Sequence, residues 1–68
     1  MQEFHLKSDY IELVKLLKLL KMAETGGHAK IMVEAGEVFL NGVQEFRKRA
    51  KLRSNDKVEI KGEIILIK

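Results

Sequence analysis

The chain has 68 residues, 46% of them hydrophobic and 34% charged, which predicts one domain over residues 1–68 with a modest core and a densely charged surface. It has no cysteine to form disulfides or a thiolate metal site, and residues 1–10 lack the apolar run of a signal peptide, so we expect a cytoplasmic protein. The net charge of +3 is small, but residues 46–57 carry six basic side chains against one acid, and such a local excess attracts phosphate groups or acidic surfaces.

The chain begins with a predicted strand and a predicted helix. Phe4 and Leu6 alternate with polar neighbours, so residues 3–7 have the pattern of a short edge strand. A helix is expected from about residue 10 to residue 22. Ser8 or Asp9 could cap it, because Asp9 with Glu12 three residues later has the spacing of a capping box.

This first helix is predicted to have one apolar side and one basic side. At about 100° per residue, one arc holds its large apolar side chains, Tyr10, Leu13, Leu16, Leu17 and Leu20. The opposite side displays three lysines, Lys15, Lys18 and Lys21. Three apolar residues belong to neither side and either lie under the N-terminal strand or touch a partner: Ile11, Val14 and Leu19. The charges within this segment exclude a membrane span.

A second, shorter helix is predicted from about residue 27 to residue 35. Thr25 is its expected N-cap, and Gly36 stands where a left-handed residue commonly ends a helix. Its inner face carries Ala29, Met32 and Val33 at helical spacing.

The second half of the chain predicts several short strands. Val38 and Leu40 alternate into a strand, and Asn41-Gly42 is a strong type I′ hairpin signal before the chain restarts at Val43. Turns at residues 55–56 and 61–62 separate strands over residues 58–60 and 64–67. A strand, two helices and then several short strands indicate the α+β class.

Residues 46–53, Phe-Arg-Lys-Arg-Ala-Lys-Leu-Arg, carry the strongest functional signal. If the segment is extended, alternate side chains line one side at roughly the spacing of phosphates along a strand: Arg47, Arg49, Lys51 and Arg53. Guanidinium groups also bind phosphate in a bidentate manner that lysine cannot match. The alternative is a solvated edge strand that uses cations against aggregation, but one or two charges meet that need, so we favour phosphate binding.

Two weaker candidates for phosphate contact lie on the predicted helices. The lysine side of the first helix, taken alone, is more typical of an ordinary solvated surface. Gly26 and Gly27 either serve capping and backbone freedom or leave N–H groups open to a phosphate, which His28 and Lys30 would then flank. The residues themselves leave these two interpretations evenly balanced.

No enzyme, cofactor or metal site is predicted. His5, Ser8 and Asp9 lie close in sequence, but proximity supplies neither the pocket nor the geometry of a catalytic triad. Two histidines without cysteine do not predict a zinc site, and the glutamates lack the spacing of a calcium loop. The three phenylalanines and one tyrosine are too few for a platform that stacks single-stranded bases.

Three blocks of the sequence together resemble a known family: Thr25-x-x-x-Ala29-Lys30, Gly36-Glu37-Val38-x-Leu40-Asn41-Gly42, and Asp56 before Val58-x-Ile60. They resemble the alpha-L RNA-binding domain that is named after small-subunit ribosomal protein S-four. The resemblance runs from about residue 11 to residue 60. Residues 16–19, 24–30 and 47–52 look more closely like a bacterial group of free-standing single-domain members.

The resemblance implies an alpha-L fold, with two N-terminal helices packed on a small, mainly antiparallel β-sheet. It also implies non-catalytic binding of structured RNA, hairpin or double-stranded, of the ribosomal or transfer type. We expect a monomer with no membrane and no small-molecule substrate among its partners. The expected RNA contacts are Arg47, Lys48, Arg49 and Lys51 first, followed by Lys18, Lys30, His28 and the backbone N–H groups of Gly26 and Gly27.

The sequence departs from the family pattern at two positions. Gly26 stands where the wider family usually has arginine, so residues 47–51 are expected to supply that charge instead. Asn55 replaces the usual glycine before Asp56, a change that asparagine accepts because it tolerates the left-handed conformation.

Two other functions compete with RNA binding. A protein adaptor would bind an acidic surface, using the apolar residues Ile11, Val14 and Leu19 within a rim of lysines. Binding of the first helix to an anionic membrane is disfavoured, because its best apolar side is expected to face the core.

Overall fold

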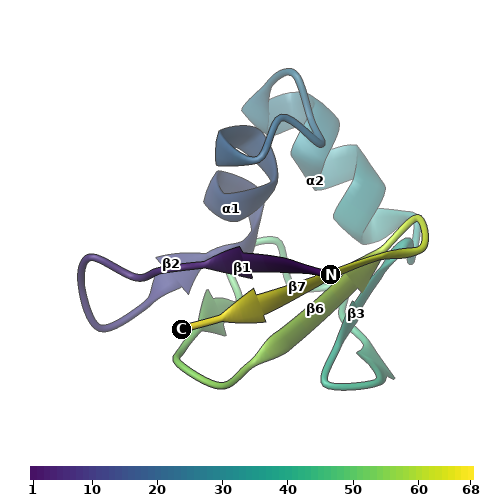
Figure 1. Cartoon of the computed structure of the whole chain (residues 1–68). Helices are drawn as coiled ribbons and strands as arrows, with labels where there is room; N and C mark the ends of the chain where they lie inside the picture. The colour runs from purple at the N-terminus through teal and green to yellow at the C-terminus, as the bar shows by residue number, and fades with distance from the viewer.

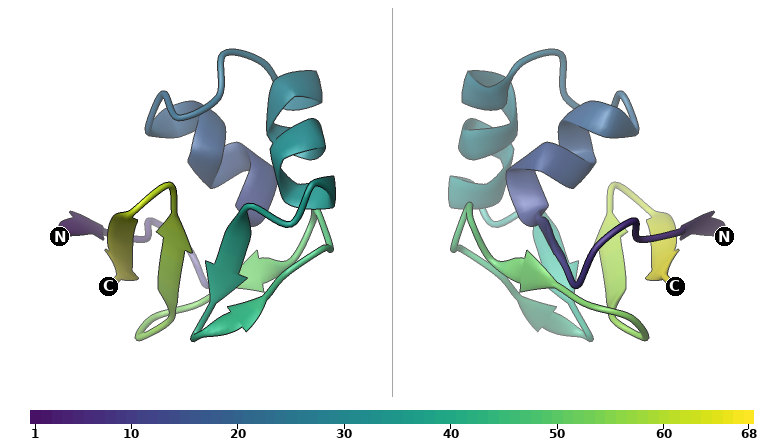
Figure 2. Two further views of the ribbon diagram at one scale, coloured as in Figure 1. Left: turned by 90° about the vertical axis from the view of Figure 1, so that its right-hand side faces the viewer. Right: turned by 90° about the vertical axis from the view of Figure 1, so that its left-hand side faces the viewer.

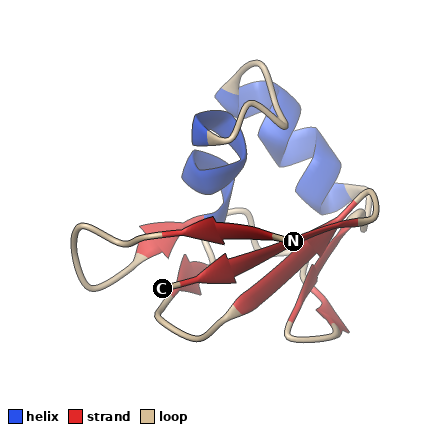
Figure 3. Ribbon diagram, viewed as in Figure 1, coloured by secondary structure: helices blue, strands red, loops and turns tan.

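Both helices lie together on one side of a five-stranded sheet (Figure 1). The computed structural model describes residues 1–68, and Figure 3 shows the helices and strands in contrasting colours. Along the chain the elements are β1 Gln2–Phe4, β2 Ile11–Glu12, α1 Leu13–Leu19, α2 Gly26–Glu34, β3 Val38–Leu40, β4 Val43–Gln44, β5 Lys51–Leu52, β6 Lys57–Ile60 and β7 Glu63–Ile67. The α+β class predicted from the sequence is confirmed.

The sheet has the strand order β1-β7-β6-β3-β4, and only the β1–β7 pair is parallel. The two hairpins turn at Asn41-Gly42 and Lys61-Gly62, where all four residues have positive φ angles, as type I′ turns require. The mainly antiparallel sheet and the Asn41-Gly42 hairpin are therefore confirmed. The sequence did not predict the separate ladder in which Ile11 of β2 pairs with Leu52 of β5.

The core is one cluster of fifteen buried hydrophobic residues, with no buried polar side chain. Alternate residues of the strands point into it, so Val58 and Ile60 of β6 are buried while Lys57 and Glu59 are exposed. The helices contribute their inner side chains to the same cluster, including Leu13, Leu16 and Leu17 of α1 and Ala29, Met32 and Val33 of α2.

The first helix begins three residues later than predicted. Ile11 and Glu12 are strand residues instead, and the N–H groups of Leu13 and Val14 donate to the carbonyls of Ala50 at 2.9 Å and Lys48 at 3.1 Å. The expected cap at Ser8 or Asp9 is therefore wrong, because carbonyls from a distant segment take the place of a side-chain cap. The expected far end of the helix is wrong as well, because α1 ends at Leu19.

The burial predicted along the first helix is correct only for its central residues. Leu13, Leu16 and Leu17 are fully buried, whereas Leu20 is only partly buried. Tyr10, expected in the core, is 38% exposed because it precedes the helix rather than forming its first turn.

The local signals around the second helix are confirmed. Thr25 caps α2, and its Oγ1 accepts a hydrogen bond from the His28 N–H at 3.0 Å. The helix begins at Gly26, one residue earlier than expected. Gly36 has a φ angle of +80° just after the C-terminal end, and Asn55 has a φ angle of +78°, so both occupy the left-handed conformation predicted for them.

Two of the sequence blocks that carry the family resemblance are bonded to each other. Asn41 donates from Nδ2 to Oδ1 of Asp56 at 3.0 Å and accepts at Oδ1 from the Lys57 N–H at 2.9 Å. Asp56 also accepts at Oδ2 from the Arg53 N–H at 2.8 Å. This cluster ties the β3–β4 hairpin to the turn before β6.

Candidate nucleic-acid interface

The basic segment, residues 46–53, follows β4, contains β5 and does not run as one extended strand (Figure 2). Residues 47–50 form a turn in which the Ala50 N–H donates to the Arg47 carbonyl at 3.1 Å. The expected single line of four alternating cations is therefore wrong. The turn buries Ala50, and only Lys51 and Arg53 keep the spacing of a shared strand face.

The turn instead gathers cations around a surface hollow of about 360 Å³, lined by Arg47, Arg49, Ala50 and Lys51. We call this the basic hollow. The chain forms only three ion pairs, and of the lining residues only Arg47 takes part in one. The charges of Arg49 and Lys51 are thus uncompensated by any acid within 4.0 Å. Such a hollow attracts anions.

Arg47 is anchored by Glu45. The guanidinium donates from Nε to Oε2 at 3.0 Å and from Nη2 to Oε1 at 3.1 Å. The side-chain hydrogen bond from Arg47 is the main cause that lowers the pKa of Glu45 below its ordinary value, and the same bond raises the pKa of Arg47. The Nη1 group of Arg47 has no hydrogen-bond partner in the chain, so one edge of the guanidinium stays open to a phosphate oxygen.

Lys18 lies on the side of α1 that leads from the basic segment to the start of α2. The Lys48 carbonyl accepts from the Val14 N–H at 3.1 Å, and Lys18 follows Val14 by one helical turn. At the other end, a Cβ atom built on Gly26 would lie 3.9 Å from Cδ of Lys18. The Lys48 backbone, the Lys18 side chain and Gly26 therefore follow one another along α1 toward the start of α2.

The start of α2 presents open backbone donors. Thr25 takes up the N–H groups of His28 and Ala29, which leaves those of Gly26 and Gly27 without a partner in the chain. Nδ1 of His28 accepts from the Glu24 N–H at 3.2 Å, so the imidazole holds the preceding loop and keeps only Nε2 free. Lys30 is exposed one turn after Gly26.

Tyr10 is a surface residue beside the basic segment that the sequence pattern did not identify. Nζ of Lys51 lies 4.9 Å from the centroid of its ring, and Cζ of Arg53 lies 5.5 Å from it. Helical periodicity assigned Tyr10 to the core. The missing signal was the pairing of Ile11 with Leu52, which brings residues 10 and 53 together although they are far apart in sequence.

The apolar residues on which an adaptor would depend are not gathered on the surface. Ile11 is only 8% exposed and belongs to the core, and Val14 is half-buried. Leu19 alone is open, at 55%. An interface with an apolar centre is therefore not formed by these three residues.

No group of three or more His, Cys, Asp or Glu side chains is arranged to hold a metal ion. Neither helix has the length and the apolar composition that a membrane crossing requires.

Comparison with known proteins gives matches over almost the whole chain. The family model described as "S4 domain" matches residues 4–68. "Putative RNA-binding protein YbcJ" of Escherichia coli (strain K12) is 36% identical over 61 residues, which cover 90% of this chain and 87% of that protein. "Uncharacterized protein YbcJ" of Shigella flexneri matches with the same identity and coverage.

A solved structure matches as well. The solution structure of YbcJ from E. coli, described as revealing an alpha-L motif involved in RNA binding, has a TM-score of 0.73 and 37% sequence identity to this chain. The match covers 98% of this chain and 86% of that one. The resemblance inferred from the sequence motifs is confirmed.

Proposed function

This chain belongs to the S4 domain family, and we propose that it binds structured RNA, hairpin or double-stranded, without catalysing a reaction. We define the basic surface as the residues through which it does so: Arg47, Lys48, Arg49, Lys51, Lys18, Lys30, His28, Gly26 and Gly27. The similarity to YbcJ, whose name describes RNA binding, supports the proposal.

The observation that carries the proposal is the basic hollow with its uncompensated cations. Arg49 and Lys51 line it without an acid in reach, and Arg47 adds the free edge of its guanidinium. A cation without an acidic partner in the chain can bind an external phosphate, and a guanidinium can take two phosphate oxygens at once. The hollow is thus suited to a phosphate group of a nucleic-acid backbone.

The continuity of the basic surface supports a duplex rather than a single phosphate. From the hollow, Lys48 and Lys18 lead to the open N–H groups of Gly26 and Gly27. Double-stranded RNA hides its base edges in a deep, narrow groove, so proteins recognise it through phosphates, 2′-hydroxyls and helix shape. A surface of cations and backbone donors provides the groups for this type of recognition. We expect weak preference for sequence.

The proposed target is ribosomal or transfer RNA, bound by a monomer in the cytoplasm. Both RNA classes consist largely of short helices closed by loops, and a small basic surface can contact one such helix. The charge of the contacts implies that binding weakens steeply as salt rises, because each neutralised phosphate releases counterions.

The test is fluorescence anisotropy with an RNA hairpin, a single-stranded RNA and a DNA duplex over a series of salt concentrations. The variant Arg49→Glu/Lys51→Glu reverses two charges of the hollow. Lys61→Glu, in the turn between β6 and β7, is the control for a charge reversal elsewhere. We expect the hairpin to bind best and the double variant to lose at least about tenfold in affinity, with a shallower salt dependence. Equal behaviour of the double variant and wild type would show that the hollow does not bind RNA.

A further inference from the structure

Tyr10 is held in a fixed position next to the basic surface. The Ser8 hydroxyl donates to the Tyr10 carbonyl at 3.1 Å, and the ladder between Ile11 and Leu52 begins at the next residue. Tyr10 is therefore placed opposite Arg53, with Lys51 diagonal to it on the same face of the ladder.

The ring of Tyr10 stands between two different environments. On one side Lys51, which contacts the ring, also lines the basic hollow. On the other, Tyr10 lines a hollow of about 260 Å³ with Ser8, Ile11, Glu12 and Lys15. A neighbouring hollow of about 360 Å³ extends this groove toward the apolar side chains of Phe4, Leu6 and Leu19. Two cations lie on one side of Tyr10. On the other lies a groove that is partly charged near Tyr10, where Glu12 and Lys15 line it, and mainly apolar toward Phe4 and Leu6.

A nucleotide has a charged phosphate at one end and a flat base with an apolar face at the other, so it can contact the cations and the Tyr10 ring together. Aromatic side chains bind bases by stacking, and they do so with any base because every base has a π face. Bases inside a duplex are already stacked on each other, so a side chain can reach only a base that is unpaired.

We propose that Tyr10 stacks on an unpaired nucleobase whose phosphate lies in the basic hollow. The inference rests on the proposed function and specifies its RNA: a helix that is interrupted or flanked by an unpaired nucleotide. The contacts of Lys51 and Arg53 with the ring do not oppose this, because stacking of a base is stronger than an exposed cation–π contact. A cation displaced from the ring is free to bind the phosphate.

The experiment compares two RNA hairpins that differ only by one bulged nucleotide, with 2-aminopurine as the bulged base. Anisotropy gives the affinities, and 2-aminopurine fluorescence, which stacking quenches, reports the contact. We expect wild type to bind the bulged hairpin about tenfold more tightly than the fully paired one and to quench the probe. Tyr10→Leu should lose the preference and the quenching but keep its affinity for the paired hairpin. Tyr10→Phe should behave like wild type.

Two results would overturn the inference: equal affinity of wild type for both hairpins, or quenching that persists in Tyr10→Leu. If wild type binds both hairpins equally and Arg49→Glu/Lys51→Glu weakens both, the basic surface still binds RNA and only the role of Tyr10 is refuted. If wild type binds neither hairpin, the proposed function fails together with the inference. Because Tyr10 is the only tyrosine and the chain has no tryptophan, its NMR ring signals provide a second, unambiguous readout of stacking.

Discussion

The Glu45 carboxylate accepts two hydrogen bonds from the Arg47 guanidinium, at 3.0 and 3.1 Å, and a third from the Arg47 backbone N–H at 2.9 Å. The side chain of Glu45 is only 12% exposed, whereas that of Arg47 is 77% exposed. Arg47 therefore reaches into solvent from a fixed base, and its partner is an acid at the margin of the basic hollow. The pair orients one cation and reduces the local positive charge at the same time.

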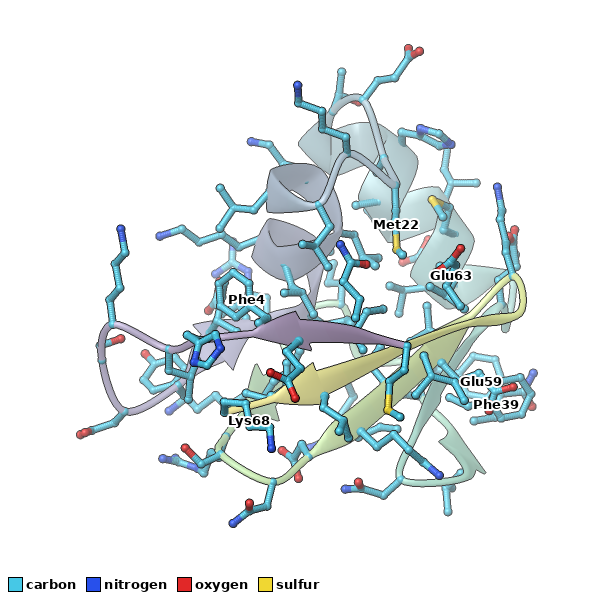
Figure 4. The ribbon with its side chains drawn as sticks, viewed as in Figure 1. Phe4, Met22, Phe39, Glu59, Glu63 and Lys68 are labelled. Atoms are coloured by element: carbon cyan, nitrogen blue, oxygen red, sulfur yellow. The ribbon has the colours of Figure 1, made fainter.

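Replacing this acid should strengthen RNA binding. Glu45→Gln keeps a side-chain acceptor for Arg47 but removes a negative charge that repels phosphate, so we expect affinity to rise about two- to fivefold at low salt. Glu59→Gln is the matched control, because Glu59 lies beside Phe39 on the face of the sheet turned away from the helices (Figure 4). Anisotropy with an RNA hairpin measures both variants. A loss of affinity in Glu45→Gln would show that Glu45 favours RNA binding more by orienting Arg47 than it opposes binding by repelling phosphate.

The hydrogen-bonded pair of Glu45 and Arg47 should make the stability of the fold depend on pH. The pKa of Glu45 in the folded protein lies below its ordinary value of 4.5. Its contribution to the free energy of unfolding is therefore present above pH 4.5 and is lost as the pH falls through the lowered pKa. Urea unfolding of wild type and Glu45→Gln from about pH 3 to pH 6 checks this. The variant should lose less stability on acidification, and identical pH profiles would contradict the prediction.

Gly36→Ala should destabilise the fold. Gly36 has a φ angle of +80°, and an added Cβ would collide with the amide of Gln44, which donates to the Gly36 carbonyl at 2.8 Å. We expect a cost of about 1–3 kcal/mol in the free energy of unfolding, from the backbone strain and the displaced Gln44 together. Gly62→Ala is the control, because Gly62 has the same φ angle but no atom within 4 Å of the added carbon. Thermal unfolding should show a larger loss of stability for Gly36→Ala than for Gly62→Ala. Equal losses would show that the contact with Gln44 adds no cost.

Gly26→Ala should lower RNA affinity without lowering the stability of the fold. The added methyl group would lie 3.9 Å from Cδ of Lys18, an ordinary contact, and Gly26 has no positive φ angle. Stability should thus stay the same or rise by up to about 1 kcal/mol. RNA affinity should fall several-fold, because the methyl group occupies space beside the open N–H groups. Unchanged affinity in a folded variant would remove Gly26 from the binding surface.

Asn41→Ala should cost more stability than Asn55→Ala. Both residues have positive φ angles, so alanine introduces similar backbone strain at each position. Only the Asn41 side chain is hydrogen-bonded, to Asp56 and to the Lys57 N–H. We expect an additional loss of about 1–3 kcal/mol at Asn41 from these two bonds. Chemical denaturation of the two variants measures the difference, and equal values would show that the bonds add no net stability.

The elements that the sequence predicted correctly are those specified by neighbouring residues. The cap at Thr25, the left-handed residue at Gly36 and the Asn41-Gly42 turn each depend on a few adjacent positions. The first helix was predicted to begin too early because its start is determined by a distant segment. Strand pairing at Ile11 and the carbonyls of Lys48 and Ala50 replace the expected cap, and periodicity cannot detect such long-range contacts.

For the candidate site, the sequence predicted where positive charge is concentrated but not how it is arranged. The basic run from Arg47 to Lys51 was visible in the order of residues along the sequence. The turn within it, the pairing of Arg47 with Glu45 and the approach of Tyr10 to Lys51 depend on tertiary structure. A local excess of charge thus predicts a phosphate-binding surface without specifying which cations remain free.

The cluster of Asn41 and Asp56 has a consequence for how such domains diverge. These side chains join two turns of the framework and belong to the blocks by which the sequence resembles the wider family. The basic hollow is lined by other residues, which lie in the turn before β5 and at the first residue of β5. If the basic hollow binds the RNA, as we propose, then the fold framework and the choice of target are encoded by different stretches of sequence. Substitutions among residues 47–51 would then redirect the protein to another arrangement of phosphates while the Asn41–Asp56 bond stays intact.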